Sequence, residues 1–211
     1  MFIFCIILKC LGYSNNVEYT STVFQVIKRE PPRSVSKDPP YGTLYSDYDK
    51  VKILIEHGGI YLDMDVLAIR PMDDLRKYSC TVGLENALKV CSGVIVCSKD
   101  HPFLYLWLDN YYDEFDPYKD LWAFHSGRVP SVLIKRYSNL IHIESDKFHK
   151  PNFRELEYIC GNKNYRWKDN YTLHTWIRLW PYNCPFPTEE SIKTMNSTYG
   201  QIARQVYYGT E

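Results

Sequence analysis

The chain has 211 residues, enough for a single domain with a sizeable hydrophobic core. Its 25 basic and 25 acidic residues balance, which argues against a nucleic acid or an anionic membrane surface as the partner. Seven cysteines occur without a Cys-x-x-Cys pair, which argues against a zinc ribbon. Aromatic residues make up 16% of the chain, which fits either rings that stack on sugars or a ring-rich core.

The N-terminal residues 1–8 are apolar, but a membrane span needs about 20 such residues. They also lack the basic start of a signal peptide. We therefore interpret residues 1–21 as the remnant of an anchor or as an incomplete first strand. Residues 22–28 partly alternate and are predicted to form a strand, whereas the prolines within 29–41 predict an irregular loop.

A helix is predicted to follow this loop. Ser46 and Asp49 have the spacing of a capping box, which predicts that the helix begins near Ser46. The Gly58-Gly59 pair can end it, because glycine adopts the left-handed conformation that closes a last turn. Apolar residues recur at helical spacing through this segment, namely Leu44, Tyr48, Val51, Leu54 and Ile55.

Two aspartates follow directly on a short apolar segment, residues 60–62, that is predicted to be a buried strand. In extended chain, residues two apart point to the same side, so Asp63 and Asp65 are expected to face one point beyond the strand. Two convergent carboxylates suit a hard cation such as Mg²⁺ or Mn²⁺. For an isolated Asp-x-Asp, however, a solvated turn is the commoner outcome.

The longer segment around the aspartates narrows these alternatives. It reads Ser-Asp, a helix, Gly-Gly-Ile-Tyr-Leu-Asp-Met-Asp-Val, and then Arg70-Pro71-Met72. This pattern resembles the DXD-motif sugar-transferring glycosyltransferases, a glycosyltransferase family 32-like group with α-1,4-galactosyl-, α-1,4-N-acetylglucosaminyl- and fungal mannosyltransferases. The resemblance covers residues 22–176. It implies an α/β fold of the GT-A type, a Rossmann-like nucleotide-sugar fold with a mostly parallel sheet.

The same resemblance assigns roles to particular residues. It implies that Asp63 and Asp65 are catalytic and hold Mn²⁺ or Mg²⁺. Asp47, Lys50, Tyr61 and Asp63 would contact a nucleotide-sugar donor such as a UDP-sugar or GDP-mannose. The family often has arginine where this chain has Lys50, and lysine supplies a point charge instead of a bidentate fork.

A histidine near the end of the predicted domain completes the candidate site. His174 and Trp176 match a His-x-Trp pattern of the family, which implies that His174 is a third metal ligand or a diphosphate contact. A lone histidine is otherwise usually an ordinary surface or core residue. We expect the His174 imidazole within roughly 5 Å of the two carboxylates, as metal–ligand distances near 2 Å require.

The remaining elements are predicted from pattern and turn chemistry. Asp100-His101-Pro102 begins a helix, with proline at its first position. Glu85-Asn86 is predicted to be a turn, although the resemblance places it beside the donor sugar and acceptor. Residues 22–180 form the predicted catalytic domain, and 181–211 a tail or closing helix. Strands are predicted at 66–69, 79–84, 92–97 and 139–144. Residues 125–130 resemble the family's Gly-Pro turn, which implies a further helix at 131–137.

The resemblance implies a metal-dependent glycosyltransferase that moves a hexose to a glycan or glycolipid acceptor with retention of configuration. It also implies a Golgi or secretory-pathway lumen and membrane association through a missing N-terminal anchor. The sequons at Asn170 and Asn196 are weak support for that location. Two alternatives are a phosphohydrolase that uses the same aspartates and a catalytically inactive binding relative. The resemblance further favours N-terminal truncation, which predicts an open wall of the nucleotide pocket where the first strand would lie.

Overall fold

The structure, a computed structural model, describes residues 6–8, 24–26, 41–113 and 123–209. Its strands are β1 Ile6–Leu8, β2 Phe24–Val26, β3 Gly59–Leu62, β4 Val66–Ala68, β5 Cys80–Asn86, β6 Lys89–Cys97, β7 His142–Glu144 and β8 Thr172–His174. Its α-helices are α1 Tyr41–His57, α2 Pro102–Asp113, α3 Val129–Arg136, α4 Leu156–Ile159, α5 Glu189–Thr194 and α6 Thr198–Tyr208. No helix among these described residues is long and apolar enough to cross a membrane.

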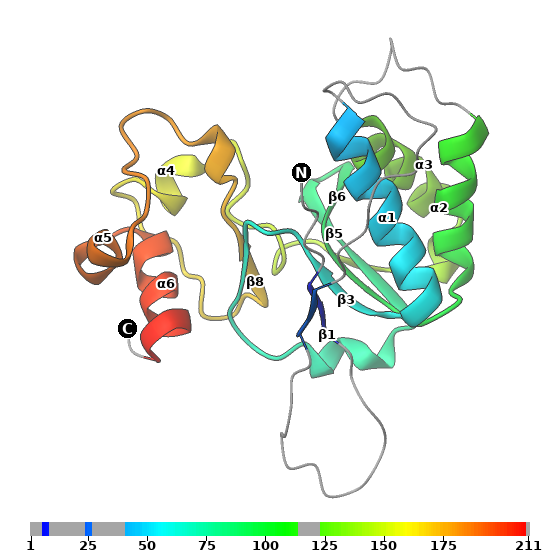
Figure 1. Ribbon diagram of the computed structural model, residues 1–211, viewed down its shortest axis with the longest axis horizontal. Coiled ribbons are helices and arrows are strands. Elements are labelled where there is room, and N and C mark those ends of the chain that lie inside the picture. Colours follow the sequence, from blue (N-terminus) through cyan, green and yellow to red (C-terminus); the bar gives the residue numbers. More distant parts are fainter. Residues whose placement is uncertain (1–5, 9–23, 27–40, 114–122, 210–211) are drawn as a thin grey trace, which may run out of the picture.

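Two sheets organise the described chain. Six strands form the larger sheet in the order β2-β1-β3-β6-β5-β7, and β4 pairs with β8 in a second sheet. Figure 1 shows α1, α2 and α3 beside the larger sheet, and α4, α5 and α6 gathered on the other side of the molecule near β8. The α/β class predicted from the sequence is therefore confirmed.

The prediction of a mostly parallel sheet is wrong. Only β5 and β7 are parallel, whereas the β1–β2, β1–β3, β3–β6 and β5–β6 pairs are antiparallel. The β5–β6 pair is a hairpin closed at Ala87-Leu88, so the chain returns at once without the crossover helix that a parallel pair needs. Buried strands look alike in sequence whichever way they run, so hydrophobic pattern did not reveal their direction.

Three further predictions need correction. Helix α1 begins at Tyr41, before the capping box at Ser46, and Glu85 and Asn86 are the last residues of β5, not a turn. Residues Ile6–Leu8 form a strand beside β3, but antiparallel to it, in contrast to the parallel first strand of the expected fold. The other residues of the predicted N-terminal segment lie outside the described ranges.

The helix α1 ends as the glycine pair predicts. Gly58 has a φ of 63°, and its peptide N–H donates to the carbonyl oxygen of Leu54 at 2.8 Å. A side chain at Gly58 would collide with the backbone of Lys99, so this position also has no room for a Cβ. The tight closure leads the chain directly into β3 and thus sets where β3 begins.

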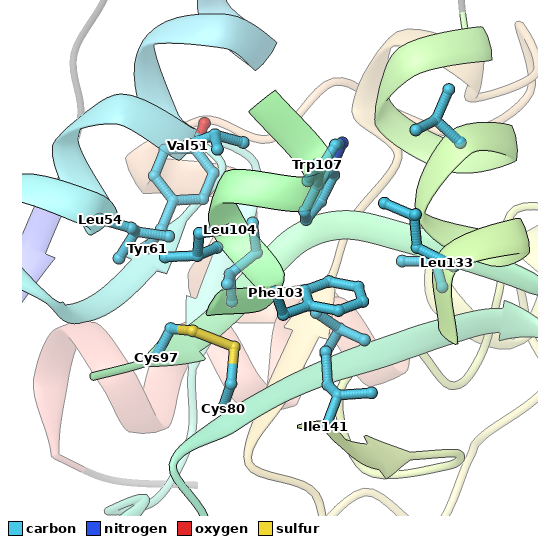
Figure 2. Packing of buried hydrophobic residues seen from close by; sticks show 14 of the residues in the cluster. Val51, Leu54, Tyr61, Cys80, Cys97, Phe103, Leu104, Trp107, Leu133 and Ile141 are labelled. Atoms are coloured by element: carbon cyan, nitrogen blue, oxygen red, sulfur yellow. A yellow bond between two sulfur atoms is a disulfide. The ribbon is translucent and has the colours of Figure 1, made fainter. Parts of the chain in front are cut away.

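The main core lies between the larger sheet and its three covering helices. Figure 2 shows Val51 and Leu54 of α1 beside Tyr61, with the Cys80–Cys97 disulfide below them. Phe103, Leu104 and Trp107 of α2 occupy the middle of the cluster, and Leu133 and Ile141 lie beyond Phe103. The Trp107 indole N–H donates to the carbonyl oxygen of His125 at 2.8 Å, so its one polar group is satisfied inside the core. This packing fixes β3, which leads to the aspartates, and β6, which pairs with β3.

A second core forms under β8. Ile159, Trp167, Leu173, Trp176, Tyr199, Ile202 and Ala203 are its buried members, together with Cys91 of β6. Helix α6 contributes three of these side chains, and a second disulfide joins Cys160 to Cys184. The C-terminal segment thus packs onto the strand that carries His174.

Candidate metal-binding active site

The two aspartates lie where the chain leaves one sheet for the other. The Asp63 peptide N–H donates to the Gly93 carbonyl oxygen at 2.8 Å, and the Val66 N–H donates to the Asp63 carbonyl oxygen at 3.0 Å. This second bond closes a four-residue turn, so the carboxylates converge through a β-turn and not through the extended chain that we expected. Their side chains are 30% and 27% exposed, which leaves both within reach of a ligand.

His174 is brought to Asp65 by the β4–β8 pair. In this pair His174 is opposite Val66, and the peptide N–H of Thr175 donates to the Asp65 carbonyl oxygen at 2.8 Å. As a result His174 Nε2 lies 3.2 Å from Asp65 Oδ1, within the separation expected from the sequence. The imidazole stacks on Trp176, with 3.7 Å between the ring centroids, so its plane is fixed.

The electrostatics of this pair follow from burial and direct contact. Burial lowers the pKa of His174, but hydrogen bonds with Asp65 and Cys91 outweigh it and raise that pKa to about 10. Burial raises the pKa of Asp65, but the His174 contact and charge lower it overall. Without a bound ion, the two groups therefore form a carboxylate–imidazolium pair.

The donor set fits a hard or borderline divalent cation. Ligand atoms of Asp63, Asp65 and His174 all lie within 4.8 Å of one another. Carboxylate oxygens suit both Mg²⁺ and Mn²⁺, and an imidazole nitrogen beside them favours Mn²⁺. A cation there would replace the proton on His174 Nε2 and would neutralise the carboxylates.

Lys50 and Asp47 form a buried ion pair behind this cation site. The Lys50 side chain is only 1% exposed, and its Nζ lies 2.5 Å from Asp47 Oδ1 and 3.8 Å from Asp63 Oδ1. It also donates to Ser92 Oγ at 2.8 Å. Burial lowers the pKa of Lys50 and raises that of Asp47, but the two carboxylates raise the pKa of Lys50 above its ordinary value. The ammonium therefore stays charged.

Tyr61 belongs to the same network. Its hydroxyl donates to Asp63 Oδ1 at 2.7 Å, and Lys50 Nζ lies 5.0 Å from the centre of its ring. The structure thus places Tyr61 and Lys50 against Asp63, where they hold its carboxylate in position. Their direct contact with a nucleotide sugar stays a prediction.

Sequence reasoning missed the contribution of β6. The β5–β6 register passes from Val82–Ile95 to Gly83–Cys91, so β6 bulges away from β5 at residues 92–94. At Gly93 a Cβ would lie 2.7 Å from His174 Cε1 and 3.1 Å from Asp63 Oδ2, which explains the glycine. A glycine inside an apolar strand signals such a close approach, and this was the available clue.

A segment of the chain that includes both aspartates is similar to a known family. Residues 13–82 match the family model described as a glycosyltransferase sugar-binding region containing a DXD motif. This segment of the chain, which contains the two aspartates, is therefore similar to the DXD-motif glycosyltransferases. The matched segment includes Asp47, Lys50, Tyr61 and both aspartates of the motif, whereas His174 lies beyond it.

Three curated proteins are similar to the chain. Glucan organizing enzyme 1 of Cryptococcus neoformans var. grubii is 25% identical over 195 residues, which are 85% of this chain and 52% of that protein. Human alpha-1,4-N-acetylglucosaminyltransferase is 20% identical over 150 residues, 64% of the chain and 42% of the human protein. Inositol phosphoceramide mannosyltransferase 3 of Schizosaccharomyces pombe is 37% identical over 65 residues, which are 31% of this chain and 18% of that protein. The chain thus spans about half, or less, of the length of these relatives.

Proposed function

We propose that the protein is a metal-dependent hexosyltransferase that uses a nucleotide-sugar donor and a glycan or glycolipid acceptor, with retention of anomeric configuration. The observation that carries this proposal is the convergence of Asp63, Asp65 and His174 at a sheet junction, in a chain whose residues 13–82 match the DXD-motif family model. The relatives are named for N-acetylglucosaminyl and mannosyl transfer, which supports a hexose as the transferred group.

The residues of the site would divide the work as follows. Asp63 and Asp65 supply carboxylate oxygens to Mn²⁺ or Mg²⁺, and His174 supplies Nε2. When bound, the ion provides a Lewis acid that stabilises the departing nucleoside diphosphate. Tyr61 donates to Asp63 Oδ1 at 2.7 Å and keeps that carboxylate oriented, as partners of metal ligands usually do.

Lys50 and Asp47 would have a supporting role. Lys50 keeps a positive charge 3.8 Å from Asp63 Oδ1, which offsets repulsion among the three carboxylates nearby. Asp47 is mostly buried against Lys50, so it contacts the ribose or base of the donor only through the part of its carboxylate that faces the site. The donor's base and sugar would be read by the pocket shape around these groups.

A secretory-pathway location, with Golgi membrane association of a longer form, is part of the proposal. The Cys80–Cys97 and Cys160–Cys184 disulfides support an oxidising compartment. Of the two sequons, only Asn196 is exposed, because the Asn170 side chain is buried and donates to the Lys150 carbonyl oxygen at 2.6 Å. Asn196 is therefore the sequon available to a glycan.

A donor screen tests the proposed activity. The full chain is incubated with UDP-sugars and GDP-mannose in Mn²⁺ or Mg²⁺, and released nucleoside diphosphate is measured. We expect turnover that EDTA abolishes and that Asp65→Asn lowers by roughly a hundredfold or more, as loss of a key electrostatic group does. Asp109→Asn, at an exposed position of α2, is the matched control.

Other outcomes of this screen would select the alternatives. Turnover of phosphate esters without sugar transfer would indicate a phosphohydrolase. Binding of a sugar nucleotide without any turnover would indicate an inactive binding relative.

A further inference from the structure

A second group of ligand-type side chains lies directly behind the aspartates. Cys91, His149 and His174 are all buried, and one ligand atom of each lies within 4.8 Å of the others. Cys91 is a free thiol, whereas four other cysteines in the described chain form disulfides. The set offers one sulfur and two imidazoles, which are the ligands that zinc prefers and that hard cations do not.

His149 is the feature that the glycosyltransferase site leaves unexplained. Its ring is fully buried, and neither Nδ1 nor Nε2 makes a hydrogen bond of good geometry among the described residues, although the backbone of Cys91 lies near enough to favour the protonated ring. Buried polar groups are nearly always paired, so two unpaired nitrogens on one ring point to a missing ligand. The ring lies against Gly83, where a Cβ would come within 2.7 Å of Nε2. The sheet therefore makes room for this imidazole instead of excluding it.

The geometry between Cys91 and His174 suits a tetrahedral ion. Zinc bonds of about 2.3 Å to sulfur and about 2.0–2.1 Å to nitrogen place neighbouring ligand atoms roughly 3.6 Å apart. Cys91 Sγ lies 3.6 Å from His174 Nδ1. Cys91 is also the cross-strand partner of Gly83, beside which His149 lies. A small movement of the His149 ring would bring one of its nitrogens to the same distance from Cys91 Sγ and His174 Nδ1.

The other nitrogen of His174 already has the partner that a metal-ligating histidine usually has. Nε2 faces Asp65 Oδ1 at 3.2 Å, so an ion on Nδ1 would complete a carboxylate–histidine–metal arrangement. We propose that Cys91, His149 and His174 bind a soft divalent cation, Zn²⁺ in the first place, in the core behind the DXD aspartates. Binding converts the Cys91 thiol to a thiolate and displaces the Nδ1 proton of the His174 imidazolium, and both protons go to solvent.

An ion at this buried site would affect metal binding at the aspartates, an effect that rests on the proposed function. A neutral imidazole has one ring nitrogen with a free lone pair. When Nδ1 binds the buried ion, Nε2 keeps its proton and donates to Asp65, so it is lost as a ligand for the ion at Asp63 and Asp65. Zinc at the buried site is thus an inhibitor of the DXD site.

Cobalt binding tests the site without any need for activity. Co²⁺ alone is titrated into the metal-free full chain, and the absorption of thiolate-to-cobalt charge transfer is recorded. We expect one equivalent of Co²⁺ to saturate a band in the wild type, and Zn²⁺ to remove it. Asp63→Asn and His142→Gln should keep the band, because neither residue belongs to the buried cluster.

Two substitutions decide the ligand set. Cys91→Ser should abolish the band while the hydroxyl keeps a polar partner for His174, and His149→Leu should abolish it as well. Thermal unfolding of each variant shows whether it is folded. If His149→Leu does not fold, the result for Cys91→Ser decides the site. A wild type without a saturable band, or a band that persists in Cys91→Ser, would overturn the site.

A competition measurement then tests inhibition. One equivalent of Zn²⁺ should weaken Mn²⁺ binding by the wild type at least about tenfold more than by Cys91→Ser, in which Zn²⁺ can compete only at the aspartates. Equal Mn²⁺ affinity with and without Zn²⁺ would refute the competition. If Asp63→Asn does not reduce Mn²⁺ binding, or if the wild type binds no Mn²⁺, the proposed function fails. The cobalt band still decides the buried site in that case.

Discussion

His174 Nε2 lies 3.2 Å from Asp65 Oδ1, and the two residues come from paired strands of the smaller sheet. The contact depends on register, because His174 is opposite Val66, the residue that follows Asp65. A slip by one residue would turn the imidazole to the other face. The ligand set is therefore determined by how β4 and β8 pair as much as by the Asp-x-Asp sequence itself.

Gly93→Ala tests whether the site needs this close approach of β6. The new Cβ would come within 2.7 Å of His174 Cε1 and 2.8 Å of Nδ1, so the imidazole must shift away. We expect Mn²⁺ affinity, measured by calorimetry, to fall about tenfold or more. Gly127→Ala is the control, because its Cβ would meet the Lys89 Cε of a flexible side chain at 2.9 Å. Equal losses in both variants would argue against the local explanation.

Lys50→Met tests the buried ion pair. The substitution preserves side-chain length but leaves the Asp47 carboxylate buried without its partner, which we expect to lower the free energy of unfolding by about 3–5 kcal/mol. Combining it with Asp47→Asn should restore most of this loss, since no uncompensated charge then remains. Urea denaturation of the two single variants and the double variant measures the coupling. Strict additivity would contradict a stabilising pair.

The pH dependence of stability should report His101. Its Nδ1 accepts from the Phe103 peptide N–H at 3.3 Å at the start of α2, so its proton lies on Nε2, 3.0 Å from Ser79 Oγ. Burial lowers the pKa of His101 below about 6.5. The unfolded chain therefore binds the proton more readily, so this contribution to stability is present above pH 6.5 and declines as pH falls.

His101→Asn isolates that contribution. Asparagine keeps an acceptor for the first turn of α2 but does not titrate. We expect the difference in unfolding free energy between wild type and variant to change as the pH falls below about 6.5, with the wild type losing more. Parallel curves over that range would show that His101 does not titrate differently in the folded protein.

The Cys80–Cys97 disulfide should stabilise the larger sheet. It joins paired residues of β5 and β6 inside the main core and closes a loop with a sequence separation of 17. Replacing both cysteines by alanine should lower the free energy of unfolding by about 3 kcal/mol, chiefly because the unfolded chain gains freedom. The Cys160–Cys184 pair, with a separation of 24, is the comparison and should give a similar loss. Unfolding in denaturant without reductant measures both.

The sequence was informative where the site is local. A strand that runs into Asp63, a helix that carries Asp47 and Lys50, and glycines between them were readable from spacing and turn chemistry. Proximity of His174 was predicted only through resemblance to a family, because nothing in a lone histidine indicates its distant neighbours. Its role as a ligand stays a prediction.

The features that the sequence did not reveal depend on pairing between distant strands. The direction of β3 relative to β6, and the bulge that brings Gly93 against His174, are set by tertiary packing and not by local propensity. The buried group of Cys91, His149 and His174 likewise exists only after three separate segments meet. Disulfide pairing was unreadable for the same reason.

The passage of the chain from one sheet to the other at Asp63–Asp65 has a mechanical consequence. One of the covalent connections between the sheets runs through this turn, while residues 69–79 and 145–171 form the others. Beside the turn, the Thr175 N–H donates to the Asp65 carbonyl oxygen at 2.8 Å. An ion shared by Asp63, Asp65 and His174 would join the same two segments a second time, through their side chains. Losing the ion would therefore weaken the contact between the two cores as well as leave the charges of the carboxylates uncompensated.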